Sequence, residues 1–265
     1  MTASVGELVE FEQFFAPAST DMIDSLVGQY RSERERIERV AELMATDLGT
    51  TVQYFAEGNQ QREHWFGLER LFRLDGAVAA LNSSYWSRTL RMTDVIDCMP
   101  QKRRDEWFEQ IREHKTPDFE ESTVRDTLGS LMAMRSQFFA ERVDGMFRAL
   151  SGDHVTNQPQ GFGKRMIIAR IISSHGTVES GRIGYINDLR CVIAKFMGRD
   201  EPHYGASDAV VRAALRNPGN WMSIDGGALR IRVYAGVGTA HLEVHPEMAW
   251  RLISVLASLY PMAIP

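Results

Sequence analysis

The sequence predicts a mostly helical α+β protein, in which an N-terminal helical bundle precedes a C-terminal domain of helices, a three-stranded antiparallel β-meander and a closing helix. Two observations support this class. Apolar residues recur at three- and four-residue steps over most of residues 20–150, which is the pattern of amphipathic helices. Between residues 221 and 245 apolar and polar residues alternate instead, which is typical of strands with one buried face.

The composition is that of an ordinary globular protein. Hydrophobic residues make up 44% and charged residues 25% of the 265 residues, which argues against a disordered chain or a membrane protein. No apolar run approaches the roughly 18 residues of a membrane helix, and the segment Met1–Glu10 lacks the basic start of a secretory signal. We therefore expect a cytoplasmic protein with no membrane contact. Because the net charge is −5, nucleic-acid binding would need a local basic face.

The N-terminal helices are predicted from successive apolar stripes within residues 1–151. The first follows Ser19, Thr20 and Asp21, whose side-chain oxygens can accept the unpaired amides of a first turn. The alternating charges of residues 31–39 indicate a solvated face of this helix rather than a nucleic-acid patch. Further helices are expected over residues 60–73 and 75–92, after Pro100, and from Ser122 to Leu150.

Residues 152–163 are polar, rich in turn-forming residues and without periodicity, so we expect a linker there. It would separate a helical domain of residues 1–151 from an α+β domain of residues 164–265. Glycines at the two turns of the meander permit the positive φ of tight hairpins, and a proline starts the closing helix. The elements expected in the second domain are helices near residues 164–174, 182–197 and 207–216, the meander 221–245, and a helix from Pro246.

One face of the meander is the candidate contact surface. Because side chains alternate along a strand, burial of the apolar residues within 229–233 leaves Arg230, Arg232 and Tyr234 on the opposite face. The same alternation adds three residues from the neighbouring strand, which are His241, Glu243 and His245. Polar and aromatic side chains from two strands are therefore expected side by side.

Three interpretations of this face stay open. The first is cross-strand ion pairing of Glu243 with Arg230 or Arg232 on a wet surface. The second is a contact face for phosphate or nucleic acid, in which arginine forks bind phosphate while Tyr234 and the histidines stack.

The third interpretation of the face is a two-histidine, one-carboxylate metal site of His241, Glu243 and His245, although consecutive same-face strand positions about 7 Å apart converge poorly on one ion. The glycine-rich segment ahead of Lys164 and Arg165 lacks the spacing of a phosphate loop. We interpret that segment as a hinge, and its two basic residues, Lys164 and Arg165, would extend the contact face.

Motifs that would identify an enzyme are absent from the sequence. It has no serine elbow, no His-Glu-x-x-His helix, no paired Cys-x-x-Cys motif and no dinucleotide fingerprint. We therefore lean against an enzyme and expect no cofactor. The two isolated thiols, Cys98 and Cys191, are expected to be buried small apolar residues.

Charged residues elsewhere are expected to serve solubility. The basic run Lys102–Arg104 is neutralised by acidic residues that follow it, so we place it on a solvated helix face. Asp188 and Arg190 lie two positions apart and cannot face each other on a helix.

Four segments of the chain resemble a bacterial family, the domain of unknown function 4942. The resemblance covers most of the chain, and its segments are Met99–Arg104 with Trp107 and Phe108, Phe138–Gly145, Gly184–Arg190, and Asp225–Leu252.

The resemblance implies a role in mobile DNA. Members of that family are encoded on plasmids, prophages and genomic islands, often near toxin–antitoxin and antirestriction genes. Longer relatives are joined to an S-adenosylmethionine-dependent DNA methyltransferase module. The present sequence has neither the glycine-rich cofactor loop nor the Asn/Asp-Pro-Pro-aromatic motif of that module, so we do not expect it to methylate DNA by itself.

The leading hypothesis is therefore an accessory protein of mobile elements that binds DNA, RNA or a nucleic-acid-processing partner. One alternative is a module that inhibits a host defence or restriction protein, for which an acidic surface would suit a basic target. A second alternative is an enzyme whose site lies between the two halves.

Overall fold

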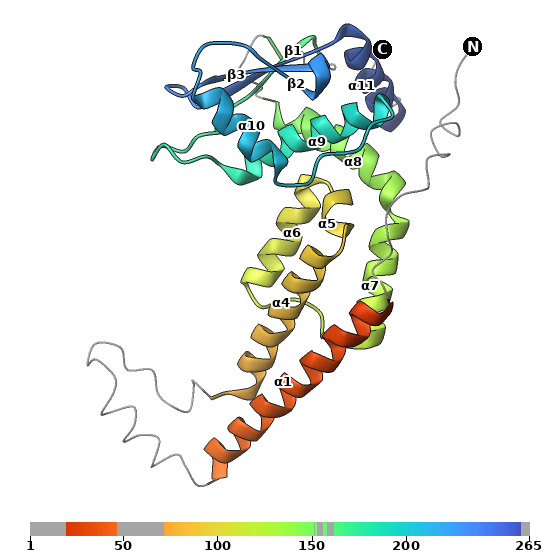
Figure 1. The fold of residues 1–265 in the computed structure, drawn as a ribbon, viewed down its shortest axis with the longest axis vertical. Coiled ribbons are helices and arrows are strands. Elements are labelled where there is room, and N and C mark those ends of the chain that lie inside the picture. The colour runs from red at the N-terminus through yellow and green to blue at the C-terminus, as the bar shows by residue number, and fades with distance from the viewer. Residues whose placement is uncertain (1–19, 47–71, 151, 153–155, 158–161, 261–265) are drawn as a thin grey trace. The chain divides into compact units, whose positions relative to one another are not determined.

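The structure is a computed structural model that describes residues 20–46, 72–150, 152, 156–157 and 162–260 (Figure 1). Its helices are α1 (Thr20–Thr46), α4 (Leu74–Met92), α5 (Val95–Cys98), α6 (Gln101–Arg112), α7 (Glu121–Ala133), α8 (Arg135–Ala149), α9 (Ser180–Phe196), α10 (Ala206–Leu215) and α11 (Pro246–Leu259). Its strands are β1 (Arg165–Ile168), β2 (Met222–Ile224), β3 (Leu229–Tyr234) and β4 (Thr239–Val244). The predicted mostly helical α+β class is confirmed. Within the described part of the chain, no helix has the length and apolar character needed to cross a membrane.

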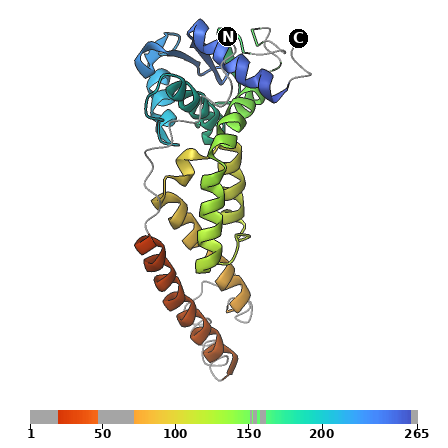
Figure 2. The same ribbon diagram turned by 90° about the vertical axis from the view of Figure 1, so that its right-hand side faces the viewer.

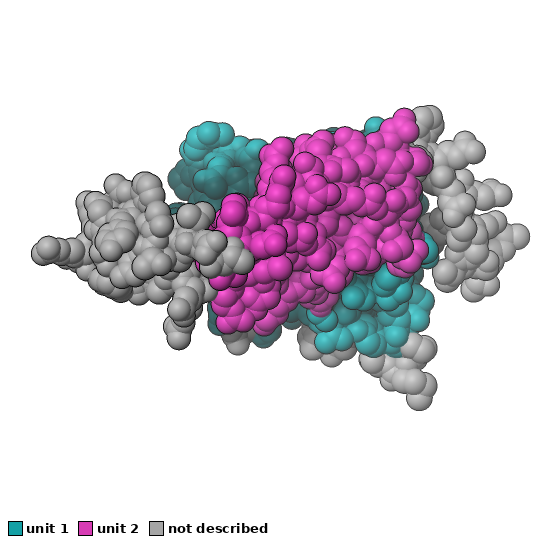
Figure 3. Space-filling view, turned by 90° about the horizontal axis from the view of Figure 1, so that it is seen from below, with its two compact units in different colours: residues 1–10, 96–105, 132–265 teal, residues 11–95, 106–131 magenta. Residues whose placement is uncertain are grey.

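The described residues group into two compact units (Figure 3). Unit 1 contains residues 96–105 and 132–260, and unit 2 contains residues 20–95 and 106–131. This grouping differs from the expected division at residues 152–163, because α8 packs against α9 and α11 and so joins the unit that holds the sheet. The division into a helical domain of residues 1–151, a linker and an α+β domain of residues 164–265 stays a prediction.

An aromatic cluster joins the helices of unit 2. The ring of Tyr30 in α1 lies 5.5 Å from that of Tyr85 in α4 and 5.3 Å from that of Phe119. Trp86 is fully buried, and its indole donates to the carbonyl of Pro117 at 2.8 Å. The buried residues of α1 are Ile23, Leu26, Val27 and Tyr30, spaced as one face of a helix requires.

The long helix expected after Ser19, Thr20 and Asp21, the helix expected over residues 75–92 and the helix expected after Pro100 are confirmed as α1, α4 and α6. The long helix expected from Ser122 to Leu150 is wrong in one respect, because it is two helices. Met134 separates α7 from α8, with φ −81° and ψ 5°, and its carbonyl accepts the first-turn amide of Phe138 at 2.9 Å. The helix expected over residues 60–73 falls almost wholly outside the described residues.

Unit 1 is built on a four-stranded antiparallel sheet in the order β1-β4-β3-β2. The expected meander is confirmed as β2, β3 and β4. The helix expected near residues 164–174 is wrong, because β1 lies there and pairs with β4, with Met166 opposite Leu242. Residues 166–168 are all buried, and a short run of consecutive apolar residues does not distinguish a strand from a helix.

Both hairpin turns contain residues with positive backbone φ angles, as the glycines there predict. Gly226 and Gly227 have φ of 65° and 88° between β2 and β3, and Gly238 has φ of 64° before β4. Asp225 adopts φ of 52° at the first turn, a conformation that aspartate tolerates better than most side chains.

The inner face of the sheet and the helices of unit 1 form one core (Figures 1 and 2). Helices α9 and α10 are confirmed at the places expected, and α10 contacts β3. The closing helix is confirmed as α11, with Pro246 in its first turn and His245 as its N-cap. The inner-face residues that are 2% exposed or less are Met166, Ile168, Leu229, Ile231, Val233, Ala240, Leu242 and Val244.

Candidate functional site

The outer face of the sheet carries rows of side chains that run across the strands, since residues paired in register share a face. In one row Arg165 of β1 lies beside Glu243 of β4, Arg230 of β3 and Ser223 of β2. The next row has Ile167, His241 and Arg232, and the third has Tyr234 and Thr239. Together these residues of β1–β4 are the outer face.

Glu243 is the acidic centre of the first row. Its Oε1 accepts hydrogen bonds from Nη2 of Arg165 at 2.7 Å and from Nε at 3.1 Å, and its Oε2 accepts one from Arg230. The carboxylate side chain is 8% exposed, whereas the two arginine side chains are 46% and 51% exposed. The expected cross-strand pairing of Glu243 with Arg230 is therefore present, and Arg165 adds a second partner.

The ionisation of Glu243 follows from these contacts. Burial raises the pKa of its carboxyl group, but the hydrogen bonds and charges of Arg165 and Arg230 outweigh burial and hold the pKa below its ordinary value. Glu243 is therefore a carboxylate at neutral pH.

Trp221, which directly precedes β2, gathers the arginines of the outer face. The guanidinium carbons of Arg165, Arg230 and Arg232 lie 5.7, 5.4 and 4.6 Å from the centre of its ring. Arg232 also lies 5.1 Å from the ring of Tyr234. Cations at these distances are attracted by the negative face of an aromatic ring.

These contacts place four of the five expected contact residues together, namely Arg165, Arg230, Arg232 and Tyr234. Lys164, the fifth, is exposed one residue before β1. Among the strand residues of the outer face, three arginines stand against one carboxylate, so the face has a formal charge of +2. Trp221 was assigned to a strand from its sequence pattern but not to the site, although a tryptophan directly ahead of an arginine-bearing hairpin is the signal that could have found it.

The contacts of His241, Glu243 and His245 do not bring the three side chains together as metal ligands. Within the described residues, no group of three or more His, Cys, Asp or Glu side chains could hold a metal ion. Glu243 binds two arginines. His245 accepts the amide of Glu247 at 3.4 Å through Nδ1, as the N-cap of α11, and the ring of His241 lies 4.6 Å from that of Tyr234.

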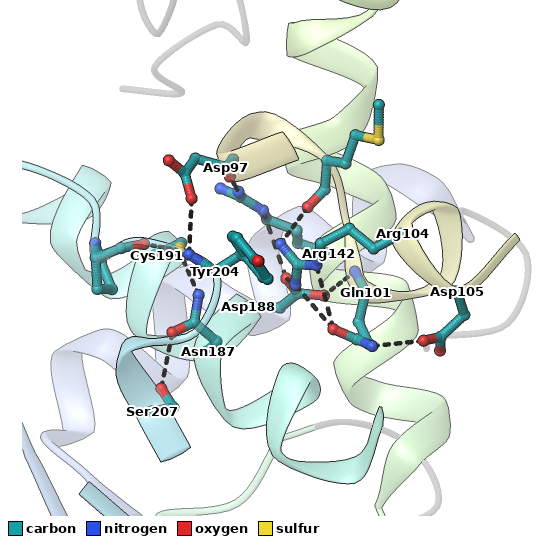
Figure 4. A network of polar contacts seen from close by, with 12 residues as sticks. Asp97, Gln101, Arg104, Asp105, Arg142, Asn187, Asp188, Cys191, Tyr204 and Ser207 are labelled. Atoms are coloured by element: carbon teal, nitrogen blue, oxygen red, sulfur yellow. Dashed lines mark hydrogen bonds and ion pairs between the residues drawn. The ribbon is translucent and has the colours of Figure 1, made fainter. Parts of the chain in front are cut away.

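A second cluster in unit 1 is a buried charge network centred on Asp188 of α9 (Figure 4). One carboxylate oxygen accepts the backbone amide of Gln101 at 2.7 Å, and the other accepts Nη2 of Arg104 at 2.9 Å. Arg142 of α8 lies 3.7 Å from the same carboxylate and also binds Glu201. The side chains of Asp188, Arg104 and Arg142 are 1%, 1% and 3% exposed.

Close packing brings the start of α6 against α9 at this network. A Cβ added to Gly184 would lie 1.7 Å from Oε1 of Gln101, so only glycine admits the contact at this position. Gln101 also donates to Asp105 at 2.7 Å. The ring of Tyr185 lies 3.5 Å from the Cβ position of Gly145 in α8, which is an ordinary van der Waals distance.

Burial governs the ionisable groups around the network. Burial raises the pKa of Asp188, while the charges of Arg104 and Arg142 oppose that rise. Burial also raises the pKa of the Cys191 thiol to about 12 and that of Cys98 above its ordinary value. Both cysteines are free and buried, as expected.

The charge pattern of the sequence predicts the wrong environment for one member of this network. Arg104 was expected on a solvated face, but its guanidinium is buried and donates to the carbonyl of Met99 at 2.7 Å. Arg103 does lie nearer the surface and pairs with Glu141 at 3.1 Å. Asp188 and Arg190 do not face each other, as expected, since Arg190 binds Asp225 at 2.7 Å instead.

The four segments that resemble a known family are the parts of the chain that meet here. Residues 99–104, 138–145 and 184–190 supply Arg104, Arg142 and Asp188, and the segment 225–252 supplies Asp225 to Arg190. A family model described as "Domain of unknown function (DUF4942)" matches residues 78–262. The chain belongs to the DUF4942 family.

The DUF4942 match contains the whole sheet, the outer face and the buried charge network, whereas α1 precedes it. No curated protein and no solved structure matches the chain.

Proposed function

We propose that this DUF4942 protein binds nucleic acid through the outer face of its sheet, as an accessory protein of mobile genetic elements. The observation that carries the proposal is the gathering of Arg165, Arg230 and Arg232 around Trp221. A local basic face is what an acidic protein of net charge −5 needs to bind a polyanion.

The arginines keep donors available for phosphate. A guanidinium carries five N–H groups in a rigid fork that matches phosphate oxygens. Glu243 accepts from two nitrogen atoms of Arg165 and from one of Arg230. Since both side chains are about half exposed, their remaining N–H groups can bind phosphate without loss of the pairing that orients them.

Glu243 would support this function by orienting Arg165 and Arg230, because its single negative charge does not neutralise both guanidinium groups. One carboxylate binds two guanidinium groups, and Arg232 is held by the rings of Trp221 and Tyr234 instead. Orientation before binding reduces the entropy that the arginine side chains lose on contact with a ligand.

The test is fluorescence anisotropy of a labelled 20-nucleotide DNA or RNA with the full chain at low salt. Because phosphate contacts release counterions, we expect affinity to fall as salt rises, with a slope that reflects two to three contacts. The double variant Arg230→Ala/Arg232→Ala should bind at least about 10-fold more weakly and show a shallower salt slope.

The matched control removes the same charge elsewhere. Arg212 and Arg251 are exposed and pair with acidic residues one turn away on α10 and α11, so Arg212→Ala/Arg251→Ala should bind as the wild type does. Equal weakening by both double variants, or no binding at low salt, would refute the proposal. The alternative of an inhibitor of a host protein would then be tested by pulldown from nuclease-treated lysate.

The accessory role in mobile elements comes from the family resemblance rather than from the site. It predicts that the ligand is DNA or RNA of the element or of the host that receives it. Binding to such nucleic acid would also bring the protein to enzymes that process it.

A further inference from the structure

We infer that the outer face binds single-stranded nucleic acid, with Trp221 and Tyr234 stacking on unpaired bases. This inference rests on the proposed function and names its ligand more closely. It depends on the shape of the sheet and on the order of aromatic and cationic groups along it.

The sheet is too wide for the groove of a duplex. Neighbouring strands lie about 4.8 Å apart, so four strands in the order β1-β4-β3-β2 separate the outer two by roughly 14 Å before side chains are added. The major groove of B-form DNA is about 12 Å wide and admits a helix or a two-stranded ribbon. The full width of the four-stranded face therefore does not fit in one groove, although the guanidinium carbon of Arg165 lies 5.7 Å from the ring centre of Trp221.

The aromatic side chains of the outer face would stack on the faces of bases and would not read their edges. Arg232 lies between two rings, 4.6 Å from the centre of Trp221 and 5.1 Å from that of Tyr234. Tyr234 in turn lies 4.6 Å from the ring of His241. In a duplex the base faces are covered by neighbouring bases, whereas in a single strand they are available to aromatic side chains and to guanidinium planes.

The two rings remain within reach of a ligand. Trp221, Arg232 and Tyr234 are each partly exposed, while the opposite side of the same strands is fully buried against the helices. A base can thus stack beside the Trp221–Arg232–Tyr234 group while Arg165 and Arg230 bind the adjoining phosphates.

The charge of the face fits the same ligand. A formal charge of +2 from the strand residues allows only a few phosphate contacts, so stacking has to supply much of the affinity. For a single strand the salt slope is about −0.7 per neutralised phosphate, against about −0.9 for a duplex. We therefore expect weak salt dependence together with strong dependence on the aromatic residues.

The experiment compares a mixed-sequence 20-nucleotide single strand, its complement and their duplex, each labelled, with the full chain at the same salt. Both single strands should bind at least about 10-fold more tightly than the duplex. Trp221→Ala should weaken single-strand binding by at least about 5-fold, the loss expected for one stacked base. Trp221→Phe should retain most of the affinity, because phenylalanine still offers a ring face.

A matched control and a spectroscopic signal guard against misfolding. Trp250 is 71% exposed on α11, so Trp250→Ala should leave binding unchanged. Stacking should quench tryptophan fluorescence on addition of unlabelled single strand, and Trp221→Phe should abolish that quenching while it still binds. This signal separates stacking from a role of Trp221 in holding the arginines.

The outcomes distinguish the two proposals. Equal or tighter binding of the duplex would overturn the single-strand inference and leave the proposed function standing. Unchanged quenching in Trp221→Phe would overturn the stacking role of Trp221. Failure of every nucleic acid to bind would instead overturn the proposed function itself.

Discussion

Replacement of Asp188 by asparagine tests whether the buried charge network holds unit 1 together. The carboxylate accepts from Gln101 and Arg104 at 2.7 and 2.9 Å, and both guanidinium groups around it are buried. In the wild type, Asp188 and Glu201 balance the charges of Arg104 and Arg142. Asparagine would leave one of the two buried positive charges without a counterion.

The expected magnitude follows from that imbalance. Removal of one partner from a buried ion pair costs about 3 to 5 kcal/mol. Glu201 still binds Arg142, so we expect about 4 kcal/mol rather than a cost for each arginine. With a urea dependence of about 2 kcal/mol per molar, the midpoint of unfolding should fall by about 2 M.

The measurement is urea unfolding followed by far-ultraviolet circular dichroism. The control Glu247→Gln removes a carboxylate that is 57% exposed and pairs with Arg251 on α11, and it should cost about 0.5 kcal/mol or less. The double variant Arg104→Met/Asp188→Asn should cost less than the sum of its single changes, because the uncompensated charge is removed. A midpoint shift for Asp188→Asn no larger than that of the control would refute the reasoning.

Three further predictions follow from the contacts of unit 1. Because burial raises the pKa of Cys191 to about 12, its thiol should resist a thiol reagent at pH 8 in the folded protein and react once the protein is unfolded. Glu243→Gln should give nucleic-acid binding a steeper salt slope, since the outer face gains one positive charge, while the loss of the ion pairs that orient Arg165 and Arg230 offsets the gain in affinity. It should also cost stability at neutral pH, a difference that vanishes as pH falls through the lowered pKa of Glu243, because the wild-type carboxylate then gains its proton. Gly184→Ala should destabilise by about 1 to 3 kcal/mol because its Cβ would collide with Gln101, whereas Gly129→Ala, with open space around it in α7, should stabilise slightly in the same unfolding measurement.

Apolar periodicity predicts the helices and strands that have one buried, apolar face and one exposed, polar face. The strand β3 alternates between buried and accessible positions, and α1 buries residues at helical spacing, so both can be recognised in the sequence. The strand β1 has three consecutive buried residues, because the side of the sheet that it would expose is covered at Ile167. A covered strand loses the alternation that identifies it, so the apolar run of β1 alone does not predict a strand.

The break between α7 and α8 shows a second limit of prediction from apolar spacing. Apolar spacing continues across Met134, and no glycine or proline interrupts residues 133–135. Contacts distant in the sequence, such as those of α8 with α9 and α11, direct the chain there. Local helix propensity does not depend on such contacts, so it does not predict the break.

The candidate site was predictable in part for the same reason. Alternation placed Arg230, Arg232 and Tyr234 on one face, but Arg165 reached that face only through the unpredicted strand β1. The buried position of Arg104 depends on Asp188, which lies far from it in the chain. A signal was nevertheless present, since Asp188 stands at helical spacing from the apolar residues Gly184, Cys191 and Val192, and a charge buried beside them requires a partner.

The two clusters of unit 1 are linked through the first hairpin turn. Arg190 of α9 binds the carboxylate of Asp225 through two nitrogen atoms, at 2.8 and 2.7 Å, and Arg199 donates to the carbonyl of the same residue at 3.0 Å. Asp225 follows β2, so these contacts fix the hairpin on which Trp221 and Arg230 stand. The helix that supplies Asp188 to the buried charge network therefore also anchors the turn of the outer face. The interior of unit 1 therefore fixes the geometry of the arginines and the tryptophan that the proposed nucleic acid would meet.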